Sequence, residues 1–210
     1  MFNYVTINQS EKIKILSGGT KMNQKFYEAM EDNPVIAAVK DDEGLELCCK
    51  CDDIKIVFII YGDVCSIRRI VSKVHEKGKI AMVHIDLIGG LSSKEIAVDY
   101  IKQETEADGI ISTKPALIKR AKALSMDTIL RVFLLDSMAF HNLEHQVQTG
   151  RPDVVEILPG LMPKAVKRVC SVIGVPVIAG GLITEKEDVL EALDAGAMAV
   201  SSTNKEVWFM

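Results

Sequence analysis

Two short polar segments near the end of the chain have the composition of a phosphate-binding turn. Gly180-Gly181 directly follows an apolar run, and Ser201-Ser202-Thr203 ends the next one. Because glycine has no side chain, backbone N–H groups can approach an anion closely there, and the hydroxyls add further donors. We therefore expect Gly180, Gly181, Ser201, Ser202 and Thr203 to hold a phosphate monoester. The alternative is that the two glycines only ease a tight turn.

Three further polar residues follow earlier apolar runs. His84 and Asp86 stand two residues apart, so they should share one face of a strand. In an enzyme, an imidazole beside a carboxylate suggests acid–base chemistry; in a sensor, the same pair can hydrogen-bond the hydroxyls of a ligand. A purely structural pair is an equally good interpretation. Lys114 can bind a ligand phosphate, or can simply be an exposed lysine at the start of a helix.

A buried charged pair is predicted within the apolar runs. Arg131 lies inside a run that should be buried on both sides, so its charge needs a partner. Glu156, in the next run, is the natural candidate. We predict an internal Arg131–Glu156 ion pair, and direct contact of either residue with a ligand is the less favoured role. Gly160, in the turn after the run of Glu156, is a further candidate for ligand binding.

The cysteines form no recognisable metal motif. Cys48, Cys49 and Cys51 are crowded together and Cys65 follows, a spacing unlike that of standard zinc sites. Buried or half-buried thiols are the default interpretation. An odd number of cysteines, five, without regular spacing is typical of a reducing compartment. We therefore expect no disulfide, no metal, no cofactor and a cytoplasmic location.

The elements that must position these residues are visible as eight apolar runs rich in Val and Ile, separated by amphipathic stretches. Such runs are typical of buried parallel strands joined by helices. The expected strands are 35–40, 55–61, 80–86, 109–113, 128–134, 154–158, 176–179 and 197–201. The expected helices are 23–30, 64–76, 93–104, 115–124, 163–173 and 185–195, with a short helix in 41–53. Eight such units favour a small, compact (β/α)₈ TIM barrel over an open sheet.

The barrel brings the candidate residues together. Its binding site is built at the C-terminal ends of the strands, where these residues lie, so they should converge on one mouth. We assign 22–210 to this single domain. Residues 1–21 are polar without a sustained period, and we expect a leader that is disordered or not native. Gly18-Gly19 can be encoded by a ribosome-binding sequence at the usual distance from a start codon, so we hypothesise that Met22 is the natural start.

The charge balance limits the partners. A formal net charge of −4 argues against binding nucleic acid through bulk electrostatics. No apolar run is long enough to span a membrane, and no secretory signal is recognisable. Any nucleic-acid contact must come from local patches, although solvated helix faces explain each of them adequately. These patches are Arg68, Arg69, Lys73, His75, Lys77 and Lys79; Lys119, Arg120 and Lys122; and Lys164, Lys167 and Arg168.

The chain resembles the glycerol uptake operon antiterminator regulatory family in five segments, whose joint occurrence in this order is specific. They are MVHIDLI (82–88), DGIISTK (108–114), RVFLLD (131–136), PDVVEILPG (152–160) and AGGLI (179–183). The resemblance implies a cytoplasmic regulator that binds glycerol 3-phosphate and acts on leader messenger RNA to prevent early termination of glycerol-metabolism transcripts. It implies no enzymatic turnover. Ligand binding would shift the protein toward an RNA-competent form or a homodimer.

The sequence is also compatible with two other functional classes. A phosphosugar or phosphotriose enzyme can use the same phosphate site, with His84, Asp86 and Lys114 as its reacting groups. A scaffold subunit with a relic phosphate site is the other class. Turnover of a phosphorylated compound favours the first, and the absence of any ligand-dependent thermal shift favours the second.

Overall fold

The computed structural model describes residues 23–210, so the expected leader 1–21 and the hypothesised start at Met22 lie outside the described residues. The strands are β1 (Val35–Val39), β2 (Ile56–Ile59), β3 (Ile80–His84), β4 (Gly109–Ser112), β5 (Asp127–Phe133), β6 (Val154–Leu158), β7 (Val177–Gly180) and β8 (Ala199–Ser202). The α-helices are α2 (Gln24–Asp32), α3 (Asp42–Cys48), α4 (Ile67–His75), α5 (Glu95–Glu104), α6 (Pro115–Ala123), α7 (Ser137–Gly150), α8 (Pro163–Val172) and α9 (Lys186–Asp194). Two 3₁₀-helices complete the set, η1 (Ile85–Leu87) and η2 (Lys205–Phe209). None of the described helices is long and apolar enough to cross a membrane.

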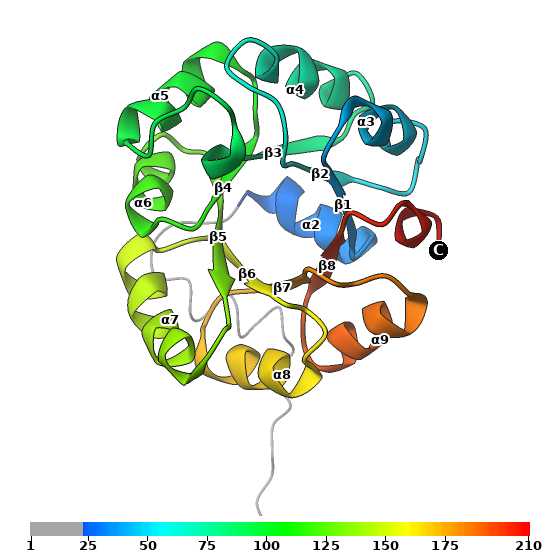
Figure 1. Ribbon diagram of the computed structural model, residues 1–210, viewed down its shortest axis with the longest axis vertical. Helices are drawn as coiled ribbons and strands as arrows, with labels where there is room; N and C mark the ends of the chain where they lie inside the picture. Colours follow the sequence, from blue (N-terminus) through cyan, green and yellow to red (C-terminus); the bar gives the residue numbers. More distant parts are fainter. Residues whose placement is uncertain (1–22) are drawn as a thin grey trace, which may run out of the picture.

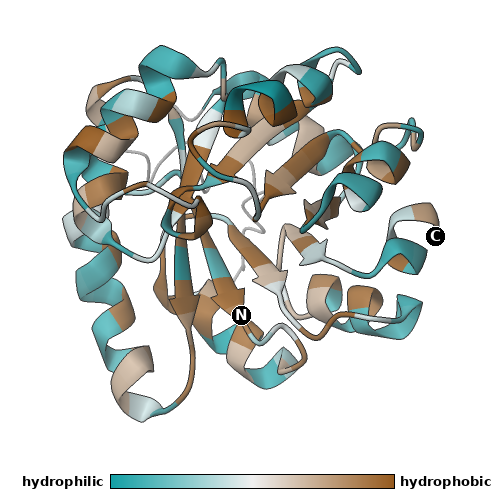
Figure 2. Ribbon diagram, turned by 45° about the horizontal axis from the view of Figure 1, so that its top comes forward, coloured by the Kyte–Doolittle hydropathy of each residue, from teal (hydrophilic) through white to brown (hydrophobic). Residues whose placement is uncertain are grey.

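The strands close into a parallel barrel in which β8 pairs with β1 (Figure 1). The predicted (β/α)₈ TIM barrel is thereby confirmed. Each strand packs against helices on its outer side and against the other strands' side chains on its inner side, which explains why the strand sequences are apolar on both faces. Figure 2 shows the hydrophobic strands enclosed by helices that carry hydrophilic residues on the outside.

Two elements differ from the sequence-based expectation. The third strand was expected to reach Asp86, but β3 ends at His84 and the chain turns into η1. The other difference is α7, in a connection for which no helix was predicted. The buried residues of α7 are only Leu143 and Gly150, so its apolar period is weak and gives little signal in the sequence.

The barrel interior changes character along its axis. At the end where the strands begin, called here the base, α2 lies across the opening (Figure 1), and its Phe26 and Met30 are fully buried among apolar strand residues. Toward the C-terminal ends, called here the mouth, the same two-residue period of inward positions brings in His84, Arg131 and Glu156. The interior therefore becomes more polar toward the mouth.

The first crossover contains the short helix that the sequence indicated. Asp41 begins α3 by accepting a hydrogen bond from the backbone N–H of Gly44 at 2.7 Å. Cys48, Cys49 and Cys51 are buried around the end of this helix, and all five cysteines are free thiols. Burial raises the pKa of the Cys48 thiol to about 12. These thiols therefore behave as core residues, in agreement with the default interpretation.

Candidate ligand-binding site at the barrel mouth

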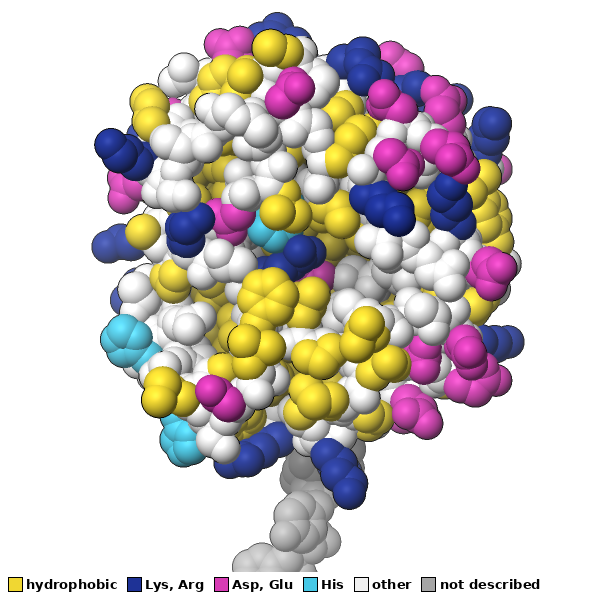
Figure 3. Space-filling view, viewed as in Figure 1, with side chains coloured by type: hydrophobic (Ala, Val, Ile, Leu, Met, Phe, Trp, Pro, Cys, Tyr) yellow, Lys and Arg dark blue, Asp and Glu magenta, His cyan; other side chains and the backbone are white. Residues whose placement is uncertain are grey.

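A cavity of about 300 Å³ opens at the C-terminal ends of the last strands. Figure 3 shows this face of the molecule, with charged side chains and a histidine at its centre and hydrophobic side chains beside them. The lining residues are Ala38, Ile60, Arg131, Glu156, Leu158, Gly181, Leu182, Ile183, Thr184, Ser201, Ser202, Thr203 and Asn204. The lining thus combines the predicted phosphate turn with the predicted buried charge pair.

The loops after β7 and β8 hold each other in place. The Ser202 hydroxyl donates to the Ile183 carbonyl at 2.7 Å and accepts from the Asn204 backbone N–H at 3.0 Å. The Asn204 side chain donates to the Thr184 carbonyl at 3.0 Å. Trp208 of η2 donates its indole N–H to the Ser202 carbonyl at 2.8 Å. The two loops therefore form one cross-linked turn, with Thr203 exposed at its edge.

Gly180 and Gly181 of this turn are required for different structural reasons. Gly181 has φ +75° and is followed by Leu182 at φ +64°, so the chain adopts two successive left-handed residues beside the cavity. Gly180 does not line the cavity. A Cβ atom at Gly180 would lie 2.5 Å from the Ser201 hydroxyl oxygen and 2.7 Å from a carboxylate oxygen of Glu156. Gly180 is thus required by the packing of Ser201 and Glu156.

The predicted ion pair between Arg131 and Glu156 is present. The two residues are register partners on β5 and β6, and the Arg131 Nε atom donates to Glu156 Oε2 at 2.6 Å. Glu156 is fully buried and Arg131 is 9% exposed. The Ser201 hydroxyl donates to the other carboxylate oxygen at 2.6 Å. Both carboxylate oxygens of Glu156 and the Arg131 Nε atom thereby have partners, as burial of charge requires.

Arg131 also has hydrogen-bond donors that Glu156 does not use. Its terminal guanidinium nitrogens make no hydrogen bond with the residues that the structure describes, and Arg131 lines the cavity. A guanidinium can donate two parallel hydrogen bonds to an anion. Arg131 is therefore able to hold Glu156 and an anionic ligand at the same time.

Asp86 and Lys114 form a second cluster at the mouth, outside the cavity lining. Asp86 accepts hydrogen bonds from the Thr113 backbone N–H at 2.7 Å and from Lys114 Nζ at 2.9 Å, and the Ser112 and Thr113 hydroxyls donate to it at 3.1 Å. Burial alone would raise the pKa of Asp86, but these donors outweigh it and the pKa lies below its usual value. Because Asp86 belongs to η1 and not to β3, the expected common strand face with His84 is wrong.

His84 is the inward residue at the end of β3. It is 2% exposed, and its buried Nδ1 atom has no hydrogen-bond partner among the described residues. Burial, and then the charge of Arg131, lower its pKa to about 4. The imidazole is therefore neutral at physiological pH and retains hydrogen-bonding capacity. Like Asp86, Lys114 and Gly160, His84 is absent from the cavity lining.

The cations predicted to contact RNA on α4 and α6 are mostly ion-paired. The pairs are Arg68–Glu104, Arg69–Asp42, Lys73–Glu46, Arg120–Asp99 and Lys122–Asp153. Lys119 is exposed and has no ion pair among the described residues. These two helices therefore offer less free positive charge than their sequences indicate.

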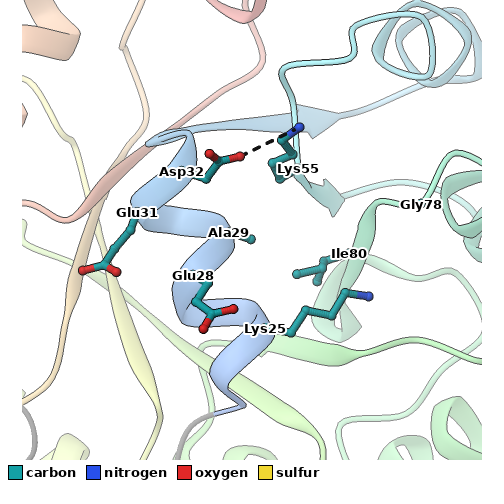
Figure 4. A pocket seen from close by; sticks show the side chains of 8 residues that line it. All are labelled: Lys25, Glu28, Ala29, Glu31, Asp32, Lys55, Gly78 and Ile80. Atoms are coloured by element: carbon teal, nitrogen blue, oxygen red, sulfur yellow. Dashed lines mark ion pairs between the residues drawn. The ribbon is translucent and has the colours of Figure 1, made fainter.

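A larger cavity, of about 520 Å³, lies at the base beside α2 (Figure 4). Its charged lining residues are exposed or half-buried, and the contact between Lys55 and Asp32 is long at 3.9 Å. Figure 4 shows these two side chains pointing toward one another, with Glu31 on the other side of the helix. In contrast to the mouth, this cavity has no buried polar side chain in its lining, so the smaller cavity is the better candidate site.

Several residues that line the cavity were not predicted from the sequence. Leu182, Ile183 and Thr184 follow Gly181, and Asn204 follows Thr203, so both loops extend farther around the cavity than the predicted residues. Asn204 could have been found from its position directly after a polar strand end. The left-handed conformation of Leu182 could not, because leucine rarely adopts it.

The strands form a closed parallel (β/α)₈ barrel, and a cavity that includes the Arg131–Glu156 pair opens at the ends of the last strands, which is the end at which TIM-barrel proteins generally build their binding sites. The sequence profile of the family described as glycerol-3-phosphate responsive antiterminator matches residues 35–208. The chain belongs to this family.

Individual proteins agree with this assignment. The chain is 45% identical over 179 residues to the uncharacterized protein YgcP of Escherichia coli K12, covering 85% of this chain and 93% of that protein. The crystal structure of a glycerol uptake operon antiterminator regulatory protein from Listeria monocytogenes matches with TM-score 0.82 and 32% identity, over 85% of this chain and 96% of that one. A glycerol uptake operon antiterminator-related protein from Thermotoga maritima matches with TM-score 0.74 and 32% identity, over 84% and 98%. A deoxyribose phosphate aldolase from Aeropyrum pernix, 15% identical with TM-score 0.66, shares the fold alone.

Proposed function

We propose that this protein is a cytoplasmic transcription antiterminator that binds glycerol 3-phosphate at the barrel mouth and, in response, binds leader messenger RNA of glycerol-metabolism operons. The observation that carries the ligand is the mouth cavity, in which a turn of small and hydroxyl residues lies together with the spare guanidinium donors of Arg131. Its volume of about 300 Å³ suits a small metabolite. The membership of the family supports the regulatory role.

In this proposal the phosphate binds to the turn formed by Gly181, Ser202 and Thr203, and Arg131 donates to it from the side of β5. Glu156 keeps the guanidinium in place and can accept hydrogen bonds from the glycerol hydroxyls with its remaining lone pairs. Contacts of the ligand with His84, Asp86, Lys114 or Gly160 stay a prediction. The same holds for Gly180, whose packing role is described above.

A matched pair of variants at Gly181 tests the phosphate site. Asn and Asp both tolerate a positive φ, and the atoms that a new side chain would meet belong to the flexible Leu158 side chain. Gly181→Asp adds a negative charge beside the phosphate, and Gly181→Asn adds the same shape without the charge. We expect calorimetry to show an affinity for glycerol 3-phosphate at least ~10-fold lower for Asp than for Asn. Equal affinities would place the phosphate elsewhere.

The coupling to RNA is tested separately. Filter binding of leader RNA to the wild-type protein, with and without glycerol 3-phosphate, should show tighter binding with the ligand, because ligand contacts to both mouth loops would favour one arrangement of them. Equal RNA affinity in both conditions contradicts the coupling. Turnover of a phosphorylated compound, abolished in Asp86→Ala, would instead identify a phosphosugar enzyme.

A further inference from the structure

The charged helices of the barrel differ in how much of their positive charge is free. On α4 and α6 the cations named above are mostly paired with carboxylates of neighbouring helices. On α8, Lys164, Lys167 and Arg168 are all exposed, and none has an ion pair among the described residues. The strongest free positive charge on one helix therefore lies on α8.

The spacing on α8 concentrates this charge on one face. Lys164, Lys167 and Arg168 are three and four residues apart, which places them side by side on the outer surface of the helix. Val166 and Val169 are buried on the opposite side. The helix carries no acidic residue, whereas the next helix, α9, is rich in acidic residues, so the positive face is bounded on that side.

The face extends onto α7 through a stacked pair. The guanidinium carbon of Arg168 lies 4.1 Å from the centroid of the Phe140 ring, which belongs to α7. Arg168 is exposed, so a guanidinium held over the ring in this way can present its other face to a further planar group. RNA bases stack on arginine planes of this kind.

The positive face meets an apolar rim at the mouth. Phe133 ends β5, Leu135 and Met138 follow it, and all three are exposed, Leu135 by 81% and Met138 by 70%. Leu161 and Leu182 are exposed in the next two loops. Figure 3 shows hydrophobic side chains over these loops, with lysine and arginine side chains at the edge where α8 lies in Figure 1. Leu182 directly follows Gly181, so the rim includes the loop proposed to hold the phosphate.

We propose that the face formed by Lys164, Lys167 and Arg168, together with this apolar rim, binds an unpaired segment of leader RNA. The inference rests on the proposed function and names its RNA surface. The lysines bind phosphates, Arg168 stacks with a base, and the rim holds further unstacked bases. Ligand binding at Gly181 acts on this surface through Leu182.

A charge-matched pair of variants tests the surface. Lys164→Glu with Lys167→Glu reverses two cations of α8, and Lys102→Glu with Lys119→Glu reverses two exposed cations of α5 and α6 without ion pairs among the described residues. Both change the net charge equally. With saturating glycerol 3-phosphate, we expect the RNA affinity of the α8 variant to be at least ~10-fold lower than that of the wild type, and that of the control to stay within about 3-fold of it. The slope of log affinity against log salt concentration should become shallower by at least about one unit, and only in the α8 variant. Affinity for glycerol 3-phosphate should be unchanged in both.

The possible outcomes separate the two proposals. If the wild-type protein binds no leader RNA, the proposed function fails. If the wild type binds RNA and both variants weaken it equally, or neither does, the surface is wrong and the function stands. If the α8 variant loses RNA binding together with self-association in light scattering, the face is an interface between copies of this chain and the RNA surface is overturned. Arg168→Lys, which keeps the charge, should lower RNA affinity by at least ~3-fold if a base stacks there, and an unchanged affinity contradicts the stacking.

Discussion

The mouth and the base of the barrel both bury charged groups, but they use them differently. At the base, Asp153 accepts from the Thr128 backbone N–H and hydroxyl, and Lys79 donates to two backbone carbonyls, so these charges bind the protein's own backbone. At the mouth, Arg131 and His84 keep hydrogen-bonding capacity that the described residues do not use. Buried charges at the base are thus used up by the protein's own groups, whereas those at the mouth leave hydrogen-bonding capacity free, which agrees with the general division of such barrels into a stabilising end and a functional end.

Each end of the barrel also contains one buried group whose pKa is shifted far from its usual value. Burial, and then the nearby charges of Asp153 and Asp108, raise the pKa of Asp127 at the base to about 6. Burial, and then Arg131, lower the pKa of His84 at the mouth to about 4. Both groups change protonation in the same pH range, and they affect the free energy of unfolding in opposite directions.

The largest effect is expected from removing the cation of the mouth. Arg131→Met leaves the fully buried Glu156 without its partner and should lower the free energy of unfolding by about 3–5 kcal/mol. Urea unfolding at pH 7 measures this change. If glycerol 3-phosphate binds as proposed, the wild type should show a thermal shift with it and this variant should not.

A base variant provides the control for that experiment. Asp153→Ala leaves the Thr128 donors and Lys122 without their acceptor and should cost about 1–3 kcal/mol. Its thermal shift with glycerol 3-phosphate should equal that of the wild type. A ligand shift that disappears in both variants, or in neither, would contradict the division between the two ends.

The second effect concerns His84 at the mouth. Its depressed pKa means that the neutral imidazole contributes stability above about pH 6.5, and that this contribution is lost as the pH falls toward 4, because the unfolded chain then binds the proton more readily. The loss should amount to about 3 kcal/mol. Urea unfolding of the wild type and His84→Gln at pH 7 and pH 4.5 should show the advantage of the wild type shrinking with acidification. A constant difference contradicts the buried neutral state.

Asp127 at the base should show the opposite slope. Because its pKa is raised, the folded protein holds the proton more tightly than the unfolded chain, so the stability contribution is full near pH 4 and is lost as the pH rises through 6. Asp127→Asn mimics the protonated form. We expect it to match the wild type near pH 4 and to be more stable at pH 8 by about 2–3 kcal/mol, measured by urea unfolding. A variant less stable than the wild type at pH 8 would show that the ionised form is needed.

The smallest effect is expected at the open cavity of the base. Lys55 and Asp32 are solvent-accessible and their contact is long, so Lys55→Gln should change the free energy of unfolding by less than about 1 kcal/mol. It should leave ligand affinity unchanged in calorimetry. A large loss of affinity for glycerol 3-phosphate in this variant would indicate that the ligand binds at the base and not at the mouth.

The fold was largely predictable because buried parallel strands need continuous apolar runs, and the sequence contains eight of them between 35 and 202. The exceptions have physical reasons. α7 buries too little of its surface to leave a clear apolar period, and β3 ends early because the chain turns into η1. The cavity was predicted in part, through the turn after β7 and the end of β8, and its extension to Leu182 and Asn204 depends on how two loops meet.

The sequence by itself determined the barrel, the turn of glycines and hydroxyl residues at its last strand ends, and the Arg131–Glu156 pair, because a charge inside an apolar strand must have a partner on a neighbouring strand. Only the tertiary structure decided that Gly180 is required by Ser201 and Glu156, that Asp86 holds the loop after β4, and which cations are free. The named cations of α4 and α6, except Lys119, are paired with carboxylates 21 to 36 residues away in the chain, whereas those of α8 have no ion pair among the described residues. Such pairing depends on which helices lie side by side, and that arrangement exists only after the barrel has closed.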